Sequence, residues 1–192
     1  ATVTLTSGGI LGTSGILTGT SYAMQSGTVS GILGGSIALA KTTVGTLIMT
    51  GNNTYSGTTT LAAGFIRATS SGGLGDGSGT NTLIFNGGTL QAGGNISSPS
   101  SRAITLTSSG LIDTNGHTID FGGTLGSASG FTKYGLGTLT TSGAVTLGNA
   151  VNISHGIFNQ AGSFAMTSGT FNVTSAGTWS NVGTGAVTLA GA

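Results

Sequence analysis

Apolar residues in the last third of the chain recur in pairs whose members are separated by one position. Five such pairs follow residue 144, at Val145/Leu147, Val151/Ile153, Phe164/Met166, Phe171/Val173 and Val187/Leu189. Because side chains alternate between the two faces of a strand, both members of a pair lie on the same face. Each pair is followed by a turn that contains Gly, Asn or both. The pattern predicts a series of short strands and favours a helix nowhere.

The apolar residues that lead these segments recur at a short and nearly regular interval. They stand at positions 145, 151, 157, 164, 171, 179 and 187, with separations of 6, 6, 7, 7, 8 and 8. An antiparallel meander or barrel would favour hairpin loops between strands of similar length. Here the turns are rich in glycine, and three strands make a circuit of roughly 21 residues. We therefore expect a right-handed parallel β-helix (a β-solenoid) of about nine coils, stacked about 4.8 Å apart.

The remaining sequence follows the same pattern less regularly, so residues 1–192 are expected to form a single β-solenoid. Leu, Ile, Val, Phe and Met should stack inside, Thr, Ser and Asn outside, and Gly at the corners. The longest stretch without strand character is AGGNISSPSSRA, residues 92–103. Pro99 would interrupt a central ladder, so this stretch is predicted to project as a loop. Residues 1–6 and 185–191 read as strands without a polar cap.

The composition narrows the class of protein further. Glycine supplies 39 of 192 residues, charged residues only 4%, and the formal net charge is +1. Intrinsic disorder requires high net charge and low hydrophobicity, and nucleic-acid binding requires clustered Lys and Arg, so neither is expected. No apolar run is long enough for a membrane helix, and no cleavable signal peptide is visible. A mature secreted protein, or a section of a longer one, fits this sequence, and the lack of cysteine agrees with a bacterial surface protein.

Few residues could carry chemistry. Asp113 and Asp120 flank His117, and Arg102 could act as a base beside a calcium ion held by the two aspartates. Calcium requires six to eight oxygen ligands, however, and Asx turns explain both aspartates without a metal. We therefore predict no catalytic, cofactor-binding or metal site, with calcium at these aspartates as the alternative.

Two other features of the sequence each allow a ligand-binding interpretation and a purely structural one. GGLGDGSGT, residues 72–80, is expected to be a loop around Asp76 rather than a calcium-binding repeat, because the motif occurs only once. The larger aromatic residues could form a sugar-stacking surface or cover core edges and turns, and the second role is expected. These residues are Tyr22, Tyr55, Tyr134 and Trp179.

The stretch KTTVGTLIMTGNNTYSGTTTLAAGFIRA, residues 41–68, resembles the autotransporter-associated β-strand repeat of bacterial passenger domains. The matching positions are Lys41, Gly45, Thr46, Leu47, Gly51, Asn53, Thr54, Tyr55, Gly57, Thr58 and Gly64. A second copy begins at Lys133 with Gly137, Thr138 and Leu139, but it lacks the Asn-Thr-Tyr turn. The resemblance covers roughly residues 36–160 and implies a secreted β-helix at a bacterial surface. It implies no activity, because such repeats serve as stalks and scaffolds.

Three function classes agree with this sequence. The first is a non-enzymatic structural unit of an extracellular fibre, sheath or biofilm matrix, which would assemble head to tail with copies of itself through uncapped strands. Other surface proteins or glycans would be further partners, without nucleic acid or membrane insertion. The second class is an adhesin-type passenger fragment. The third, a polysaccharide-active enzyme, is least supported because ionisable residues are so few.

Overall fold

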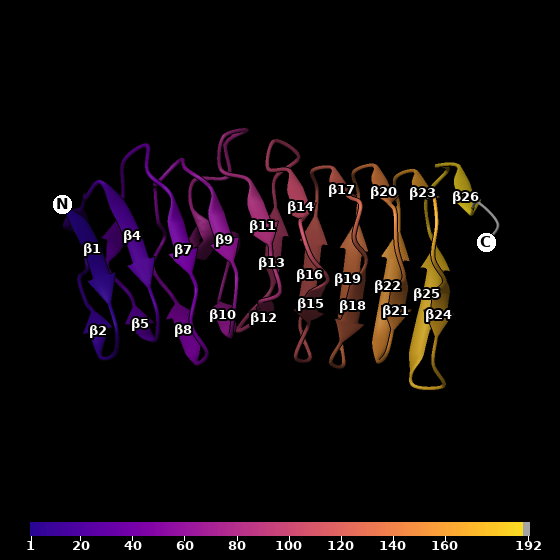
Figure 1. Cartoon of the computed structure of the whole chain (residues 1–192), viewed down its shortest axis with the longest axis horizontal. Coiled ribbons are helices and arrows are strands. Elements are labelled where there is room, and N and C mark those ends of the chain that lie inside the picture. Colours follow the sequence, from indigo (N-terminus) through magenta and orange to yellow (C-terminus); the bar gives the residue numbers. More distant parts are fainter. Residues whose placement is uncertain (190–192) are drawn as a thin grey trace.

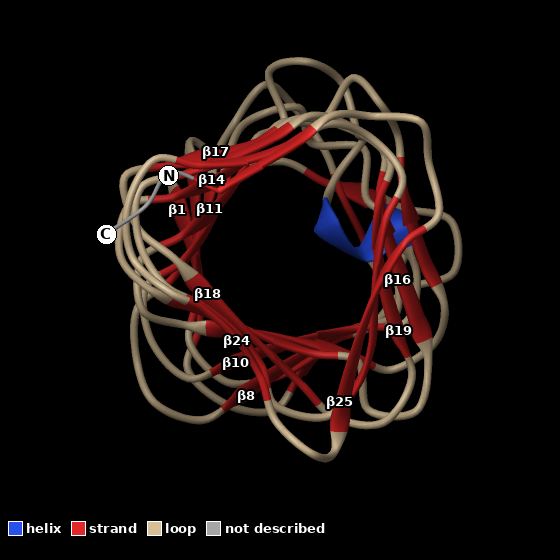
Figure 2. Cartoon of the chain, turned by 90° about the vertical axis from the view of Figure 1, so that its right-hand side faces the viewer, coloured by secondary structure: helices blue, strands red, loops and turns tan. Residues whose placement is uncertain are grey.

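A computed structural model describes residues 1–189 as a right-handed parallel β-solenoid. The strands stack side by side along one axis, with β1 (Thr2–Leu5) and β26 (Val187–Leu189) at opposite ends of the rod (Figure 1). Viewed along the axis, three sides surround a common interior, and the chain runs counter-clockwise as it approaches the viewer (Figure 2). The predicted fold class is therefore confirmed.

Most strands belong to three parallel sheets, one for each side of the coil. The first sheet contains β1 (Thr2–Leu5), β4 (Ser21–Met24), β7 (Leu39–Lys41), β9 (Thr59–Leu61), β11 (Leu83–Phe85), β14 (Ile104–Leu106), β17 (Leu125–Ser127), β20 (Val145–Leu147), β23 (Phe164–Met166) and β26 (Val187–Leu189). The second contains β2 (Gly9–Ile10), β5 (Gly27–Val29), β8 (Thr46–Met49), β10 (Phe65–Ala68), β12 (Thr89–Ala92), β15 (Gly110–Asp113), β18 (Phe131–Tyr134), β21 (Val151–Ile153) and β24 (Phe171–Val173). The third contains β13 (Ile96–Ser98), β16 (Thr118–Phe121), β19 (Thr138–Thr141), β22 (Gly156–Gln160) and β25 (Gly177–Asn181).

The coil length varies around the expected value. Residues paired across adjacent coils of the first sheet are 17 positions apart at the shortest, Tyr22 with Leu39, and 24 at the longest, Thr59 with Leu83. The ten strands of this sheet mark about nine coils, as expected. The seven leading apolar positions from 145 to 187 fall one each in β20 to β26, so the repeat predicted from spacing is confirmed.

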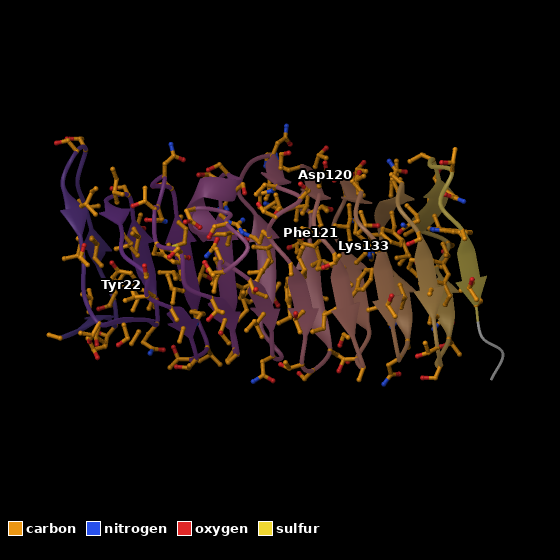
Figure 3. All side chains as sticks on the ribbon, turned by 90° about the horizontal axis from the view of Figure 1, so that it is seen from above. Tyr22, Asp120, Phe121 and Lys133 are labelled. Carbon is orange, nitrogen blue, oxygen red and sulfur yellow. The ribbon has the colours of Figure 1, made fainter. Side chains whose placement is uncertain are left out.

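The interior is built from columns of apolar side chains, because parallel pairing without a register shift places equivalent positions above one another. One column on the third side runs through Ile96, Ile119, Leu139 and Phe158, all of which are at most 1% exposed. Figure 3 shows the alternation at Asp120 and Phe121, neighbours that lie on opposite faces of β16. Burial of these apolar columns is the main stabilising contribution, at roughly 25 cal/mol per Å².

The third side changes character along the rod. In the first coils it contains only the short pair β3 (Ile16–Leu17) and β6 (Ile32–Leu33), and residues 51–57 cross it without a strand. A 3₁₀ turn, η1 (Ser71–Leu74), occupies it next, and the regular third sheet begins at β13. Within residues 1–189 there is no helix whose length and hydropathy would allow it to cross a membrane.

The structure differs from the loop predicted at 92–103. The centre of that stretch is β13, which pairs with β16, and Ile96 and Ser98 face the core. Pro99 lies just after the strand, where the N–H of Arg102 donates to the Pro99 carbonyl and closes a turn. Proline therefore ends this strand without removing a ladder hydrogen bond, and the chain returns directly to the core at Arg102.

Two further details of the strand predictions change. Ile157 leads its segment in the sequence, but it is 41% exposed, and its neighbour Phe158 is the buried residue. The strand predicted at 185–191 is present as β26 (Val187–Leu189), and residues 190–191 lie outside the described part of the chain.

Candidate binding face

Three of the four cationic side chains lie in the core. Lys41, Arg102 and Lys133 are each 0% exposed, so Arg67 is the only Lys or Arg side chain outside the core of the described chain. Each buried cation stands two positions from a buried apolar residue, at Leu39, Ile104 and Phe131 respectively. Strand alternation therefore points all three inward. Three of the four Lys and Arg charges are therefore carried inside the protein, and Arg67 is left on the outside of the described chain.

Lys133 is the penultimate residue of β18 and closes the corner formed by residues 133–137, which we call the Lys133 corner. Its Nζ donates to Thr114 Oγ1 at 2.8 Å and to the carbonyls of Tyr134, Gly135 and His155 at 3.0, 2.6 and 2.8 Å. These acceptors come from three successive coils, so one ammonium group links them. Burial lowers the pKa of Lys133 to about 8, and the nearby Asp113 carboxylate opposes that shift. Figure 3 shows Lys133 inside the ribbon.

Lys41 has the same role at residues 41–45, the Lys41 corner. Its Nζ donates to the carbonyl of Thr43 in the same corner and to that of Ala63 in the next coil at 3.3 Å. Burial also lowers the pKa of Lys41. The two corners lie on different edges of the solenoid, because Lys41 joins the first sheet to the second and Lys133 joins the second to the third.

A glycine in the next coil completes each corner. Gly64 has φ +62°, and a Cβ there would lie 2.4 Å from the Gly45 carbonyl oxygen and 2.9 Å from Lys41 Nζ. Gly156 has φ +69°, and its Cβ would lie 2.4 Å from the Gly137 oxygen and 2.9 Å from Lys133 Nζ. The second copy of the repeat is thus complete at its corner although its Asn-Thr-Tyr turn is missing.

The Asn-Thr-Tyr turn of the first copy stabilises the side of the coil that lacks a strand. Asn53 Oδ1 accepts from the Leu33 N–H at 2.9 Å, and Asn53 Nδ2 donates to the Gly73 carbonyl at 3.1 Å. One side chain thereby replaces ladder hydrogen bonds to the coils before and after it. Tyr55 fills the core and its hydroxyl contacts Thr59 Oγ1 at 2.7 Å.

Arg102 does not hydrogen-bond to Asp113 or Asp120, the two aspartates with which the sequence suggested a calcium-dependent site. Its Nε and Nη2 donate to Asn81 Oδ1 at 3.0 and 2.6 Å, and Nη2 also donates to the Gly75 carbonyl at 3.0 Å. Its Nη1 donates to Ser71 Oγ at 3.0 Å and to the Ser71 carbonyl at 3.3 Å. Burial lowers the pKa of Arg102. The guanidinium therefore orders η1 and the 75–81 loop from inside the solenoid.

The aspartates have separate environments. Asp113 Oδ1 accepts from the Asn115 N–H at 2.9 Å, which is the Asx turn expected at this residue. An Asx turn was also expected at Asp120, but this residue lies within β16, faces outward and accepts from Ser142 Oγ at 2.9 Å. Asp76, expected in a loop, accepts from the Ser78 N–H through Oδ1 at 2.9 Å. Among residues 1–189, no three His, Asp or Glu side chains come together as a metal-binding group.

The outer face of the second sheet carries four polar side chains in one row. Arg67 pairs with Gln91, Gln91 with Asp113, and Asp113 with Tyr134 on successive coils. Gln91 Nε2 donates to Asp113 Oδ2 at 2.8 Å. Coils in such a sheet are about 4.8 Å apart, so the row presents one functional side chain per coil along the axis. We call this row the Arg67–Tyr134 row.

The row ends in a pocket of about 320 Å³, the Tyr134 pocket. It lies between two consecutive corner turns and is lined by Asp113, Asn115, Gly116, Tyr134, Gly135 and Leu136. Tyr134 is 44% and Leu136 70% exposed, and the His155 ring packs edge to face on Tyr134 at 4.9 Å between centroids. Tyr22 and Tyr55 are buried and Trp179 packs half-buried against the core, as expected of residues that cover the core, whereas Tyr134 is at the surface.

These features define a parallel β-solenoid in which buried lysines close two of the corners and whose exterior carries few charges. Residues 39–68 match the family model of the Passenger-associated-transport-repeat, which confirms the resemblance of the first copy. The Adhesin BmaC autotransporter of Brucella suis biovar 1 (strain 1330) is 34% identical over 110 residues, which is 57% of this chain. The match spans 3% of that protein's length. No solved structure matches the chain.

Proposed function

We propose that this chain is a section of an adhesin-type autotransporter passenger, exposed at the bacterial surface, and that it binds without catalysing a reaction. The similarity to an autotransporter adhesin over 57% of the chain carries this proposal. The passenger repeat at residues 39–68 supports the same secretion route. A stiff rod with one outward row of functional groups suits attachment, because the backbone ladders hold these groups at a fixed spacing.

Adhesion of the purified chain to cells tests this proposal. Beads coated with the folded chain should attach to epithelial cell layers in greater numbers than beads coated with a charge-matched unrelated protein. Beads coated with the same chain after irreversible unfolding provide a second control, because they keep the composition and lose the solenoid. Equal attachment of all three bead types would contradict an adhesin role.

Localisation has its own test in the bacterium that encodes the chain. An antibody against the folded solenoid should label intact cells or the medium, and protease added to intact cells should remove the label. Labelling that requires permeabilised cells would contradict surface exposure.

A second proposal is end-to-end association of copies, the structural role expected from the sequence. Side chains at equivalent positions are buried in inner coils and exposed in the last described coils. Val173 is 45% exposed, whereas Ile153, its partner in the coil before, is buried. Leu189 is 56% exposed, whereas its partner Met166 is 3% exposed. An open parallel edge can pair either with a second copy or with a further coil of one polypeptide. Sedimentation and electron microscopy over a concentration series would show rods of increasing length for self-association, and rods of one length would contradict it.

A further inference from the structure

We propose that the Tyr134 pocket binds a single neutral hexose unit of a glycan, with Tyr134 and Leu136 against the sugar ring and Asp113 and Asn115 at its hydroxyl groups. This inference rests on the surface-binding role proposed above and specifies the class of ligand. It starts from the size of the pocket, about 320 Å³. That volume is at the lower end of small-molecule sites, so it suits one ring rather than a folded peptide segment.

The lining combines two kinds of contact that a monosaccharide requires. Tyr134 and Leu136 are exposed apolar surfaces at the same corner, and Tyr134 presents an aromatic ring to solvent. The C–H groups on one face of a hexose pack on such a ring, while its hydroxyls need hydrogen-bonding partners at the edge. Asp113 and Asn115 supply a carboxylate and an amide on the opposite turn of the pocket.

The polar groups are held in place before any ligand arrives. Asp113 accepts from the Asn115 N–H at 2.9 Å and from Gln91 Nε2 at 2.8 Å, and Asn115 Nδ2 donates to the Ala92 carbonyl at 3.1 Å. Lys133 fixes the opposite wall, because its Nζ donates to the carbonyls of Tyr134 and Gly135. Preorganisation of this kind reduces the entropy lost on binding.

The charge of the pocket favours a neutral ligand. Asp113 is the only ionisable carboxylate in the lining, and the Lys133 ammonium lies directly behind the wall that faces it. The two charges offset one another, so a cationic ligand gains less than an isolated aspartate would offer. A sulfated or sialylated sugar would bring its negative charge to Asp113, and like charges disfavour such a complex.

The Lys41 corner provides a natural control for this site. Val44 occupies the place of Leu136 and is 84% exposed, but Thr42 stands where the second corner has Tyr134. Thr42 Oγ1 contacts Gln25 Oε1 of the previous coil at 3.2 Å, where the second corner has Asp113. The first corner therefore has the backbone and the apolar tip without the aromatic ring and the carboxylate.

Fluorine NMR of the whole chain labelled with 3-fluorotyrosine localises binding. The probes are the methyl glycosides of glucose, galactose, mannose and N-acetylglucosamine, with choline as the cationic probe and sialic acid as the anionic probe. We expect a saturable shift of the exposed Tyr134 resonance with at least one neutral glycoside, in the millimolar range, while the buried Tyr22 and Tyr55 resonances stay unchanged. A shift of the Tyr134 resonance that occurs only with choline or sialic acid would overturn the proposal. The absence of a shift with every probe would overturn it as well.

Variants then test the residues by saturation-transfer NMR on the ligand. Leu136→Ser and Tyr134→Ser should each weaken binding about tenfold, because they remove the surfaces that contact the ring. Val44→Ser and Thr42→Ser, at the equivalent places of the Lys41 corner, should leave it unchanged. Equal effects at both corners would refute the assignment.

The bead assay separates this inference from the adhesin role. Adhesion that survives in Tyr134→Ser, together with sugar binding by the unsubstituted chain, would show that another surface carries the attachment. Adhesion without any glycoside binding would sink the pocket assignment and leave the adhesin proposal standing.

Discussion

Replacement of Lys133 by methionine tests whether a buried ammonium holds three coils together. Methionine keeps a flexible, unbranched apolar side chain and removes all three N–H donors. Four oxygen atoms lose this donor, namely Thr114 Oγ1 and the carbonyls of Tyr134, Gly135 and His155. The Tyr134 carbonyl still accepts from the Thr114 N–H at 3.0 Å, and the Gly135 carbonyl can still accept from the Thr114 hydroxyl at 3.1 Å.

The magnitude follows from the groups left without a partner. The His155 carbonyl is then left without a donor, and one unpaired buried carbonyl costs about 1–3 kcal/mol. Relief of the desolvation of the ammonium offsets part of that cost. We expect Lys133→Met to lower the free energy of opening of the surrounding coils by roughly 1–3 kcal/mol.

Native-state hydrogen exchange is the suitable assay, because a solenoid opens coil by coil rather than in one step. Amides of β18, β19 and β22 should lose protection in Lys133→Met, while those of β1 and β4 should not change. Arg67→Met is the matched control, since it removes a cation from the outer face of the second sheet and should change protection by less than about 0.5 kcal/mol. If Lys133→Met is as mild as Arg67→Met, water replaces the ammonium at no cost and the reasoning is refuted.

Three further predictions concern the corners and the core. Gly156→Ala should destabilise its coils by at least about 2 kcal/mol, because alanine would be strained at φ +69° and its Cβ would lie 2.4 Å from the Gly137 oxygen. Hydrogen exchange measures this loss, with Gly126→Ala as the control, because a Cβ at Gly126 would meet nothing within 4 Å. Equal effects of the two substitutions would contradict the prediction. Tyr55→Phe should cost about 1 kcal/mol in urea unfolding, because it removes the 2.7 Å contact with Thr59 Oγ1, and no loss relative to Tyr134→Phe would disprove this. Stability should rise between about pH 8 and 10.5, because the folded chain releases the Lys133 proton near pH 8 whereas the unfolded chain retains it up to its ordinary pKa of 10.5. The rise, at most about 3 kcal/mol at 1.36 kcal/mol per pKa unit, should shrink in Lys133→Met, and a fall over this range would show that the pKa is raised instead.

The sequence by itself determined the local rules of this protein. Apolar positions spaced by two, with turns every six to eight residues, specified short strands with one inward face. Glycine at the corners and the near absence of charge left a parallel coil as the arrangement that buries those faces. The Lys-Gly-Thr-Leu pattern at residue 41 marked the first copy of the repeat, because its residues are close together in the chain.

The sequence also contains local signals that place the three buried cations inside the core. Lys41 and Lys133 stand two positions after a buried apolar residue, and Arg102 two positions before one. Alternation alone would have placed all three inside. The loop predicted at 92–103 failed for a similar reason: Ile96 and Ser98 alternate, but Pro99 and the serines beside them concealed so short a strand.

Only the tertiary structure decided which distant residues meet. Ile157 and Phe158 are both apolar, and the column of Ile119 and Leu139 in the neighbouring coils selects Phe158 for the core. Gly156 completes the Lys133 corner from the next coil, and Tyr134 meets Asp113 across a coil boundary, 21 positions away in the sequence. Such contacts depend on the exact length of each coil, which varies from 17 to 24 residues along the first sheet. No local pattern encodes that length, because it is set by how each coil packs on the one beneath it.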